Sequence, residues 1–175
     1  MKKLVLDELN RASIDEFKAQ DKNDFVIVLD NIRSMNNVGS AFRTCDAFAA
    51  KKLYLTGITA TPPHREITKT AIGAQESVDW DYAENTATLL EQLRLEGYAL
   101  VAVEQTDASI SLIDFQPEPS KKYAFIFGNE VFGVSDEALE LVDIAVEIPQ
   151  FGTKHSLNIS VCCGVVSWDY ICKKR

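Results

Sequence analysis

Three short segments of the chain combine polar side chains with glycine, and each follows an apolar, strand-like run. They are residues 30–43 ("DNIRSMNNVGSAFR"), residues 127–135 ("FGNEVFGVS") and residues 148–158 ("IPQFGTKHSLN"). In parallel α/β sheets, ligands bind at loops beyond the carboxyl ends of the strands. We therefore expect the chemistry of this protein to reside in these three segments.

The second segment looks at first like a phosphate-binding loop, because Gly128 and Gly133 have the spacing of a P-loop. A P-loop needs a lysine followed by Ser or Thr after its last glycine, and Val134 stands in the lysine position. The acidic pair at 136–137 would also repel a phosphate at the start of a helix. The segment suits a ligand read by backbone groups, with Glu130 free to accept hydrogen bonds or to pair with an arginine. A loop carboxylate that caps backbone amides is the alternative for Glu130.

The first segment is predicted to lead into a helix, with Asn36 or Asn37 as its N-cap. Gly39 and Arg43 are four residues apart and share a face of that helix. Because Gly39 has no side chain, a ligand has room to approach the backbone beside the Arg43 guanidinium. An exposed, solvated arginine explains Arg43 equally well from spacing alone.

The third segment leads into a helix expected from about residue 156 to residue 172. Its side chains from 157 to 168 are apolar nearly all round, so the helix must be covered by its own domain or by a partner subunit. Asn158 and Ser160 must find hydrogen-bond partners there, and a satisfied structural amide is the simpler explanation for Asn158. A serine nucleophile is not indicated, because neither histidine lies near an obvious third member of a triad.

Strand-like and helix-like patterns alternate along the rest of the chain. Strands are expected at 25–29, 53–55, 78–80, 98–103, 123–127 and 144–148, and helices at 38–49, 67–72, 83–96, 135–140 and 156–172. This alternation predicts an α/β domain with a mostly parallel sheet.

Composition narrows the class of protein. With 46% hydrophobic and 25% charged residues, the 175-residue chain matches an ordinary globular protein of one domain. It has no apolar run near the roughly 18 residues that span a bilayer, and no signal-peptide core. We therefore expect a cytoplasmic protein without membrane contact.

Cysteine spacing and charge bear on metals and nucleic acids. The four cysteines form no C-x-x-C pair, so we expect reduced, buried thiols and no metal site. The net charge of -8 argues against an extended nucleic-acid surface. The basic residues gather in a few loops, however, which leaves room for a local positive patch.

Together the three segments resemble a known family. "NNVGSAFRTCDAFA" at 36–49, "FIFGNEVFGVS" at 125–135 and "IPQFGTKHSLNISV" at 148–161 resemble, in order, the three motifs of the SpoU (TrmH-like) branch of the SPOUT RNA methyltransferases. The resemblance spans nearly the whole chain. It implies a mostly parallel sheet with helices on both faces and a C-terminal segment threaded into a trefoil knot. We expect one methyltransferase domain over residues 1–175; that no separate RNA-binding domain is expected is a departure from the family.

The resemblance further implies a cofactor, a reaction and a partner. The cofactor is S-adenosylmethionine, bound bent in the knot, and the reaction is methyl transfer to a ribose 2′-hydroxyl of tRNA or rRNA. The residues implied for cofactor binding are Phe127, Gly128, Asn129, Ile148, Gln150, Ser156 and Leu157. Those implied for catalysis are Arg43, Asn36, Glu130, Ser156 and Asn158. Family members usually form homodimers, so the apolar last helix is expected to pack against its copy.

The family assigns the removal of the hydroxyl proton to the arginine at Arg43. Arginine normally stays protonated, and an arginine in that state would instead orient the hydroxyl or the adjacent phosphate. A Glu130–Asn36 pair is expected to order the site, with Ser156 and Asn158 beside Arg43. Gln150 departs from the family pattern, which has a methionine there, and the acidic composition leaves the RNA substrate open. The alternative function is a non-catalytic RNA-binding or scaffold protein of the same fold.

Overall fold

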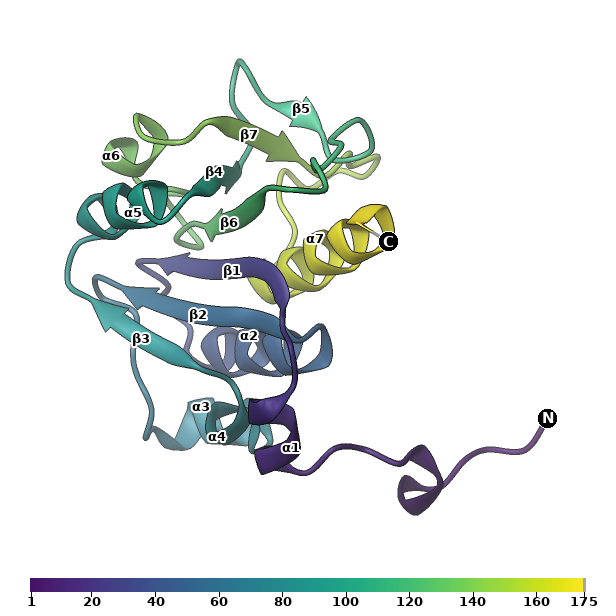
Figure 1. Cartoon of the computed structure of the whole chain (residues 1–175). Coiled ribbons are helices and arrows are strands. Elements are labelled where there is room, and N and C mark those ends of the chain that lie inside the picture. Colours follow the sequence, from purple (N-terminus) through teal and green to yellow (C-terminus); the bar gives the residue numbers. More distant parts are fainter. Residues whose placement is uncertain (175) are drawn as a thin grey trace.

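The computed structural model describes residues 1–174, and their seven strands form one sheet (Figure 1). The strand order is β3-β2-β1-β6-β4-β7-β5, and every neighbouring pair is parallel. The strands are β1 (Asn23–Asp30), β2 (Ala50–Thr56), β3 (Trp80–Ala83), β4 (Tyr98–Val103), β5 (Ile110–Ser111), β6 (Lys122–Phe127) and β7 (Ile144–Glu147). The predicted parallel α/β class is confirmed.

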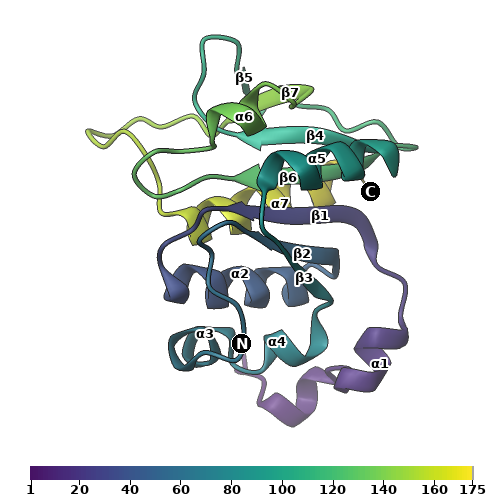
Figure 2. The same ribbon diagram turned by 90° about the vertical axis from the view of Figure 1, so that its left-hand side faces the viewer.

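Helices cover both faces of the sheet (Figure 2). Side chains of a strand alternate between the faces. Phe25, Ile27 and Leu29 of β1 accordingly join one buried cluster, while Val26 and Val28 join the other. The helical elements are η1 (Leu6–Leu9), α1 (Ile14–Ala19), α2 (Met35–Ala47), α3 (Arg65–Ala71), α4 (Ala74–Ser77), α5 (Thr86–Leu95), α6 (Asp136–Leu139) and α7 (Ile159–Lys174). The first cluster includes residues of α2, α3 and α7, and the second includes residues of α5 and α6.

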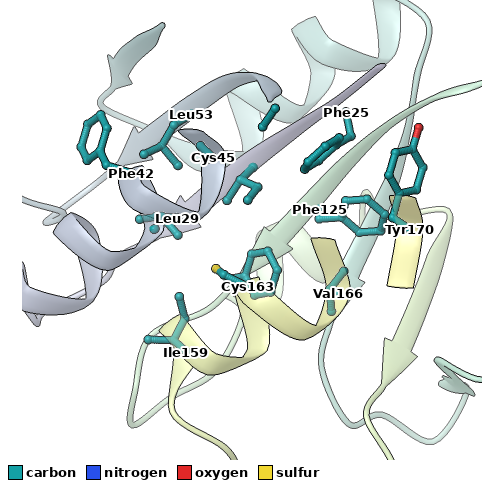
Figure 3. Packing of buried hydrophobic residues seen from close by; sticks show 14 of the residues in the cluster. Phe25, Leu29, Phe42, Cys45, Leu53, Phe125, Ile159, Cys163, Val166 and Tyr170 are labelled. Carbon is teal, nitrogen blue, oxygen red and sulfur yellow. The ribbon is translucent and has the colours of Figure 1, made fainter. Parts of the chain in front are cut away.

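The last helix, α7, buries one side against the sheet and α2. Figure 3 shows Ile159, Cys163 and Val166 pointing into the cluster that contains Phe25 and Phe125. The other side of α7 is exposed, as described below. The expectation that this helix is covered on most sides therefore holds for one side only within a single chain.

Several element boundaries differ from the sequence-based expectation. The helix expected at 83–96 begins only at Thr86, because Asn85 caps it by accepting from the Thr88 N–H at 2.9 Å. This leaves Trp80–Ala83 free to form β3, instead of a strand at 78–80. The last helix starts at Ile159, three residues later than expected, and extends to Lys174.

The strand order brings the polar segments together. The chain lays β2 and β3 on one side of β1, then returns to place β6, β4 and β7 on the other side. Because all strands are parallel, the loops that follow β1, β4, β6 and β7 leave the same edge of the sheet. All three segments singled out above are therefore at that edge. The trefoil knot expected near the C-terminus stays a prediction, and no helix of residues 1–174 is both long and apolar enough to cross a membrane.

Candidate active site

A cavity of about 600 Å³ lies at the carboxyl ends of β4, β6 and β7. This volume is within the range of about 300 to 1,000 Å³ that is typical of small-molecule and cofactor sites. The loops after these strands and the start of α7 line it. The lining includes all the residues predicted to bind a cofactor: Phe127, Gly128, Asn129, Ile148, Gln150, Ser156 and Leu157. The structure therefore gathers the predicted set around one space.

The turn after β6 is held rigid by its own hydrogen bonds. Asn129 and Gly133 exchange two backbone hydrogen bonds of 2.9 Å. The Asn129 Oδ1 accepts from the Val131 and Phe132 N–H groups, and its Nδ2 donates to the Asn31 carbonyl at 2.7 Å. A Cβ at Gly128 would lie 2.0 Å from the Val134 nitrogen, so the turn itself requires glycine there.

Glu130 joins this turn to the start of α2. Its carboxylate accepts from the Arg33 N–H at 2.9 Å, the Ser34 N–H at 3.0 Å and the Asn37 Nδ2 at 2.9 Å. Burial raises the pKa of Glu130, but these hydrogen bonds outweigh that effect and hold the pKa below its ordinary value. Glu130 is thus an ionised anchor between two of the three segments. It caps the backbone amides of Arg33 and Ser34, so the alternative expected for it, a loop carboxylate that caps backbone amides, is confirmed alongside its hydrogen bond to Asn37.

The partner of Glu130 is Asn37, which corrects the expected pairing with Asn36. Ser34 is the N-cap of α2, and its Oγ accepts from the Asn37 N–H at 3.3 Å. Both asparagines therefore lie inside the helix, where consecutive side chains point about 100° apart. Asn37 is buried and faces Glu130, whereas Asn36 is exposed. Within residues 1–174, the Asn36 side chain makes no hydrogen bond.

Asn158 brings the third segment to the same residue. Its Nδ2 donates to the Asn37 Oδ1 at 3.2 Å, and its Oδ1 accepts from the backbone and hydroxyl of Ser160 at 2.9 and 2.6 Å. A carboxylate can only accept, so Glu130 fixes which way the Asn37 amide points and leaves its oxygen for Asn158. Glu130, Asn37 and Asn158 form one chain of hydrogen bonds across all three segments. The expectation that Asn158 finds partners is confirmed.

Arg43 lies outside this chain of hydrogen bonds. It is exposed, it does not line the cavity, and its guanidinium has no hydrogen bond or ion pair among residues 1–174. It lies seven residues after Asn36, and therefore on the same face of α2 two turns further along. Ser156 and Asn158 both line the cavity, but neither makes a hydrogen bond to Arg43. The structure thus groups Glu130, Ser156 and Asn158 at the cavity and leaves Arg43 and Asn36 on a neighbouring surface.

What approaches Gly39 is protein rather than a ligand. A Cβ there would lie 2.1 Å from the Thr70 Oγ1 and 2.3 Å from the Ile67 carbonyl oxygen, both on α3. The Thr70 hydroxyl also donates to the Asn36 carbonyl at 2.9 Å. The glycine therefore allows α2 and α3 to pack closely, which corrects the expectation of a ligand beside it.

Two acidic residues of this edge were missed by the sequence reasoning. Asp30 is fully buried at the end of β1 and accepts from the Asn31 Nδ2, the Thr86 hydroxyl and the Ser135 N–H at 2.6 to 2.8 Å. Glu104 follows β4 and lines the cavity. Both residues directly follow an apolar, strand-like run in the sequence. An acidic residue in that position could have been recognised as a candidate for the site.

The cysteines and the possible metal ligands add no further chemistry to the site. Burial raises the pKa of the Cys45 and Cys163 thiols well above the usual range, so they stay neutral and packed. Cys172, by contrast, is exposed, so the expectation of buried cysteines does not hold for every one. In the part of the chain that the structure describes, no three His, Cys, Asp or Glu side chains are grouped to hold a metal ion.

Comparisons with known proteins agree with this geometry. The profile of the family described as "SpoU rRNA Methylase family" matches residues 24–168. A tRNA (guanosine(18)-2′-O)-methyltransferase of Thermus thermophilus is 30% identical over 163 residues, covering 93% of this chain and 81% of that protein. A 23S rRNA (guanosine-2′-O-)-methyltransferase, RlmB, of Vibrio cholerae is 27% identical, covering 94% of this chain and 65% of that protein. The crystal structure of an AdoMet-bound rRNA methyltransferase from Sinorhizobium meliloti superposes with a TM-score of 0.78 at 25% identity, over 85% of this chain and 56% of that one.

Proposed function

Because the chain belongs to the SpoU rRNA methylase family, we propose that its cavity holds the methyl donor and that Arg43 acts on the RNA ribose. The protein is an S-adenosylmethionine-dependent methyltransferase of ribose 2′-hydroxyls in tRNA or rRNA. The assignment of residues within it is the proposal developed here. The observation that carries it is the chain of hydrogen bonds Glu130–Asn37–Asn158, which ties the cavity to the helix that bears Arg43.

The residues around the cavity fit S-adenosylmethionine. The volume suffices, and the turn after β6 and the loop after β7 offer backbone groups to a bent ligand. Four carboxylates belong to the lining: Glu104, Glu130, Asp136 and Glu147. An acidic lining suits a cofactor that carries a sulfonium and an ammonium group, and it disfavours RNA phosphates. The RNA therefore approaches from outside, with only the target ribose near the cavity.

When bound, the cofactor supplies an electrophilic methyl group. Transfer of that methyl would join it to the ribose 2′-oxygen, break its bond to sulfur and release the hydroxyl proton to solvent. The protein must hold the oxygen in line and lower the barrier to proton loss. Arg43 stays protonated, so we assign it to orienting the ribose hydroxyl or its adjacent phosphate. Ser156 and Asn158 lie on the cavity wall, where we assign them to positioning the target nucleotide. Asn158 also holds α2 in place through its hydrogen bond to Asn37.

The exposed cations also indicate the side on which RNA binds. On loops and helices at the carboxyl edge, four exposed cations have no ion pair among residues 1–174: Arg33, Arg43, Arg65 and Lys154. Several lysines at the opposite edge are engaged by other groups, whereas Lys51 there is exposed without an ion pair among residues 1–174. Lys52 pairs with Asp81, Lys121 pairs with Glu118, and the Lys122 Nζ donates to the Glu96 carbonyl. The four unpaired cations at the carboxyl edge are thus available to RNA phosphates.

A homodimer accounts for the exposed side of α7. Val161, Val165 and Trp168 follow one another at helical spacing in α7, and Leu157 lies two residues before its start; all four are 37 to 60% exposed. We refer to these four residues as the α7 stripe. Leu157 also lines the cavity, so a second copy packed on the α7 stripe would lie beside the bound cofactor. The proposed dimer therefore closes the site as well as burying apolar surface. We also propose that residues 1–175 form one methyltransferase domain.

The test of this function uses total RNA from cells that lack the protein. Incubation with a methyl-labelled cofactor, nuclease digestion and chromatography should give a labelled 2′-O-methyl nucleoside. A labelled base would contradict the reaction. Cofactor binding without any transfer would support a scaffold of the same fold.

A further inference from the structure

Glu104 stands at a position that the methyl-transfer chemistry above does not use. It is the first residue after β4, it lines the cavity, and its backbone N–H donates to the Val146 carbonyl of β7 at 3.0 Å. Its side chain crosses to the turn after β6, where Oε2 accepts from the Val134 N–H at 3.1 Å. The other oxygen, Oε1, accepts from the Gln105 N–H at 2.9 Å.

The surroundings of Glu104 fix its carboxylate in place. A Cβ at Gly133 would lie 2.3 Å from Oε2, so the carboxylate fits there only because the turn has glycine at this point. The adjacent Gln105 donates from Nε2 to the His155 carbonyl at 3.1 Å. The two residues after β4 thereby contact both loops that line the cavity. The other three carboxylates of the lining differ from Glu104. The Glu130 carboxylate is held by backbone N–H groups, but it is turned toward α2 instead of the cavity. The side chains of Asp136 and Glu147 make no contact among those described for residues 1–174.

The remaining hydrogen-bonding capacity of Glu104 indicates a ligand group. Each carboxylate oxygen has two acceptor positions, and in this protein each is used once by a backbone N–H. Two neighbouring acceptors on one rigid carboxylate are thus left for the cavity. Two adjacent hydroxyl groups match that pattern. An acidic side chain after a parallel strand binds ribose hydroxyls in the same way in dinucleotide-binding folds.

We propose that Glu104 binds the 2′- and 3′-hydroxyls of the cofactor's own ribose and thereby sets specificity for an intact ribonucleoside cofactor. The inference rests on the proposed position of the cofactor in this cavity. Hydrogen bonding of Glu104 to the ribose hydroxyls differs from a simple electrostatic attraction of its carboxylate for the sulfonium charge. S-adenosylhomocysteine, the demethylated product, lacks that charge but keeps both hydroxyls, so it separates the two explanations.

The test is calorimetric binding of S-adenosylhomocysteine and of its 2′-deoxy and 3′-deoxy analogues. Wild-type protein should lose roughly tenfold or more in affinity for each deoxy analogue, because a hydrogen bond to a charged group is lost. In Glu104→Ala the three ligands should bind within about twofold of one another. Glu147→Ala, which removes a carboxylate from the same lining, should keep the wild-type differences.

A second variant guards against a folding defect. Glu104→Gln keeps the size of the side chain but removes its charge, so the loss of affinity for each deoxy analogue should be smaller than in wild type, because hydrogen bonds to a neutral amide are weaker than those to a carboxylate. Discrimination unchanged in Glu104→Ala or in Glu104→Gln would overturn the proposal. So would a variant that loses only the preference for S-adenosylmethionine over S-adenosylhomocysteine. Wild-type protein that binds none of these ligands would instead contradict the position of the cofactor in the cavity.

Discussion

Asn37 donates from Nδ2 to the Glu130 carboxylate at 2.9 Å, although 93 residues separate the two in the chain. This contact orders the start of α2 against the turn after β6. Together with the backbone N–H groups of Arg33 and Ser34, it holds the pKa of Glu130 below its ordinary value, against the opposing effect of burial. A carboxylate whose pKa is lower in the folded state stabilises the protein above its unfolded-state pKa, and that stabilisation is lost as the pH falls through the folded-state value.

We predict a loss of stability below about pH 4.5 that depends on Glu130. Denaturant unfolding across pH 3 to 7 would measure it, as the unfolding free energy of wild type minus that of Glu130→Gln. The difference should be constant near neutral pH and should shrink in acid, because the unfolded state then binds the extra proton. Glu118→Gln is the matched control, since Glu118 lies at the opposite edge of the sheet beside Lys121. A difference that does not change with pH would contradict this account.

Arg43→Ala should abolish catalysis without affecting folding. Because Arg43 is exposed and makes no ion pair among residues 1–174, its removal should leave the melting temperature and the cofactor affinity nearly unchanged. Methyl transfer should fall at least roughly a hundredfold, the low end for a positioned catalytic group. Arg43→Lys should not restore it, because an ammonium lacks the planar fork of a guanidinium. Activity retained in Arg43→Ala would exclude the catalytic role.

Val165→Asp should dissociate the dimer and leave the subunit folded. Val165 belongs to the exposed α7 stripe, whereas its neighbour Val166 is 1% exposed and packs in the core. Light scattering at micromolar concentration should show a dimer for wild type and a monomer for the variant, with similar circular dichroism spectra. Leu95→Asp, at a 90% exposed position on α5, should remain a dimer. A monomeric wild-type protein would contradict the proposed interface.

Charge reversal at the carboxyl edge should weaken RNA binding. In Arg65→Glu combined with Lys154→Glu, we expect lower affinity for tRNA and a salt dependence whose slope falls by about one per lost phosphate contact. Filter binding between low and physiological salt would measure both quantities. The control, Lys121→Glu combined with Lys122→Glu, changes the net charge equally at the opposite edge. Equal effects of the two pairs would show that only net charge matters.

The alternation of strands and helices was sufficient for the fold class, and the resemblance to the SpoU motifs supplied the residues predicted to bind the cofactor, all of which line the cavity. The sequence did not place Asn36 and Asn37 correctly. The two are adjacent in a helix, and which of them faces Glu130 depends on the N-cap, which fell on Ser34 rather than on either asparagine. Gly39 was misassigned for a similar reason, since a close helix–helix contact and an open ligand path both require a missing side chain.

The roles of Asp30 and Glu104 depend on partners far away in the chain. Asp30 accepts from Thr86 and Ser135, and Glu104 accepts from Val134, and none of these pairings has a local signature. Such partners are fixed only when the sheet is assembled. A strand-end acid in the sequence therefore predicts a site, but it does not show whether the acid supports the backbone or binds a ligand.

The hydrogen bond from Asn158 to Asn37 spans 121 residues and also bears on the order of folding. Contacts between residues so far apart in the chain form late and slow folding, because a large loop must first close at a cost in conformational entropy. During synthesis, α2 is complete long before the segment that carries Asn158 has been made. The cavity can therefore bind a ligand only at the end of folding. A ligand that binds only the finished state then stabilises the last part of the chain to dock.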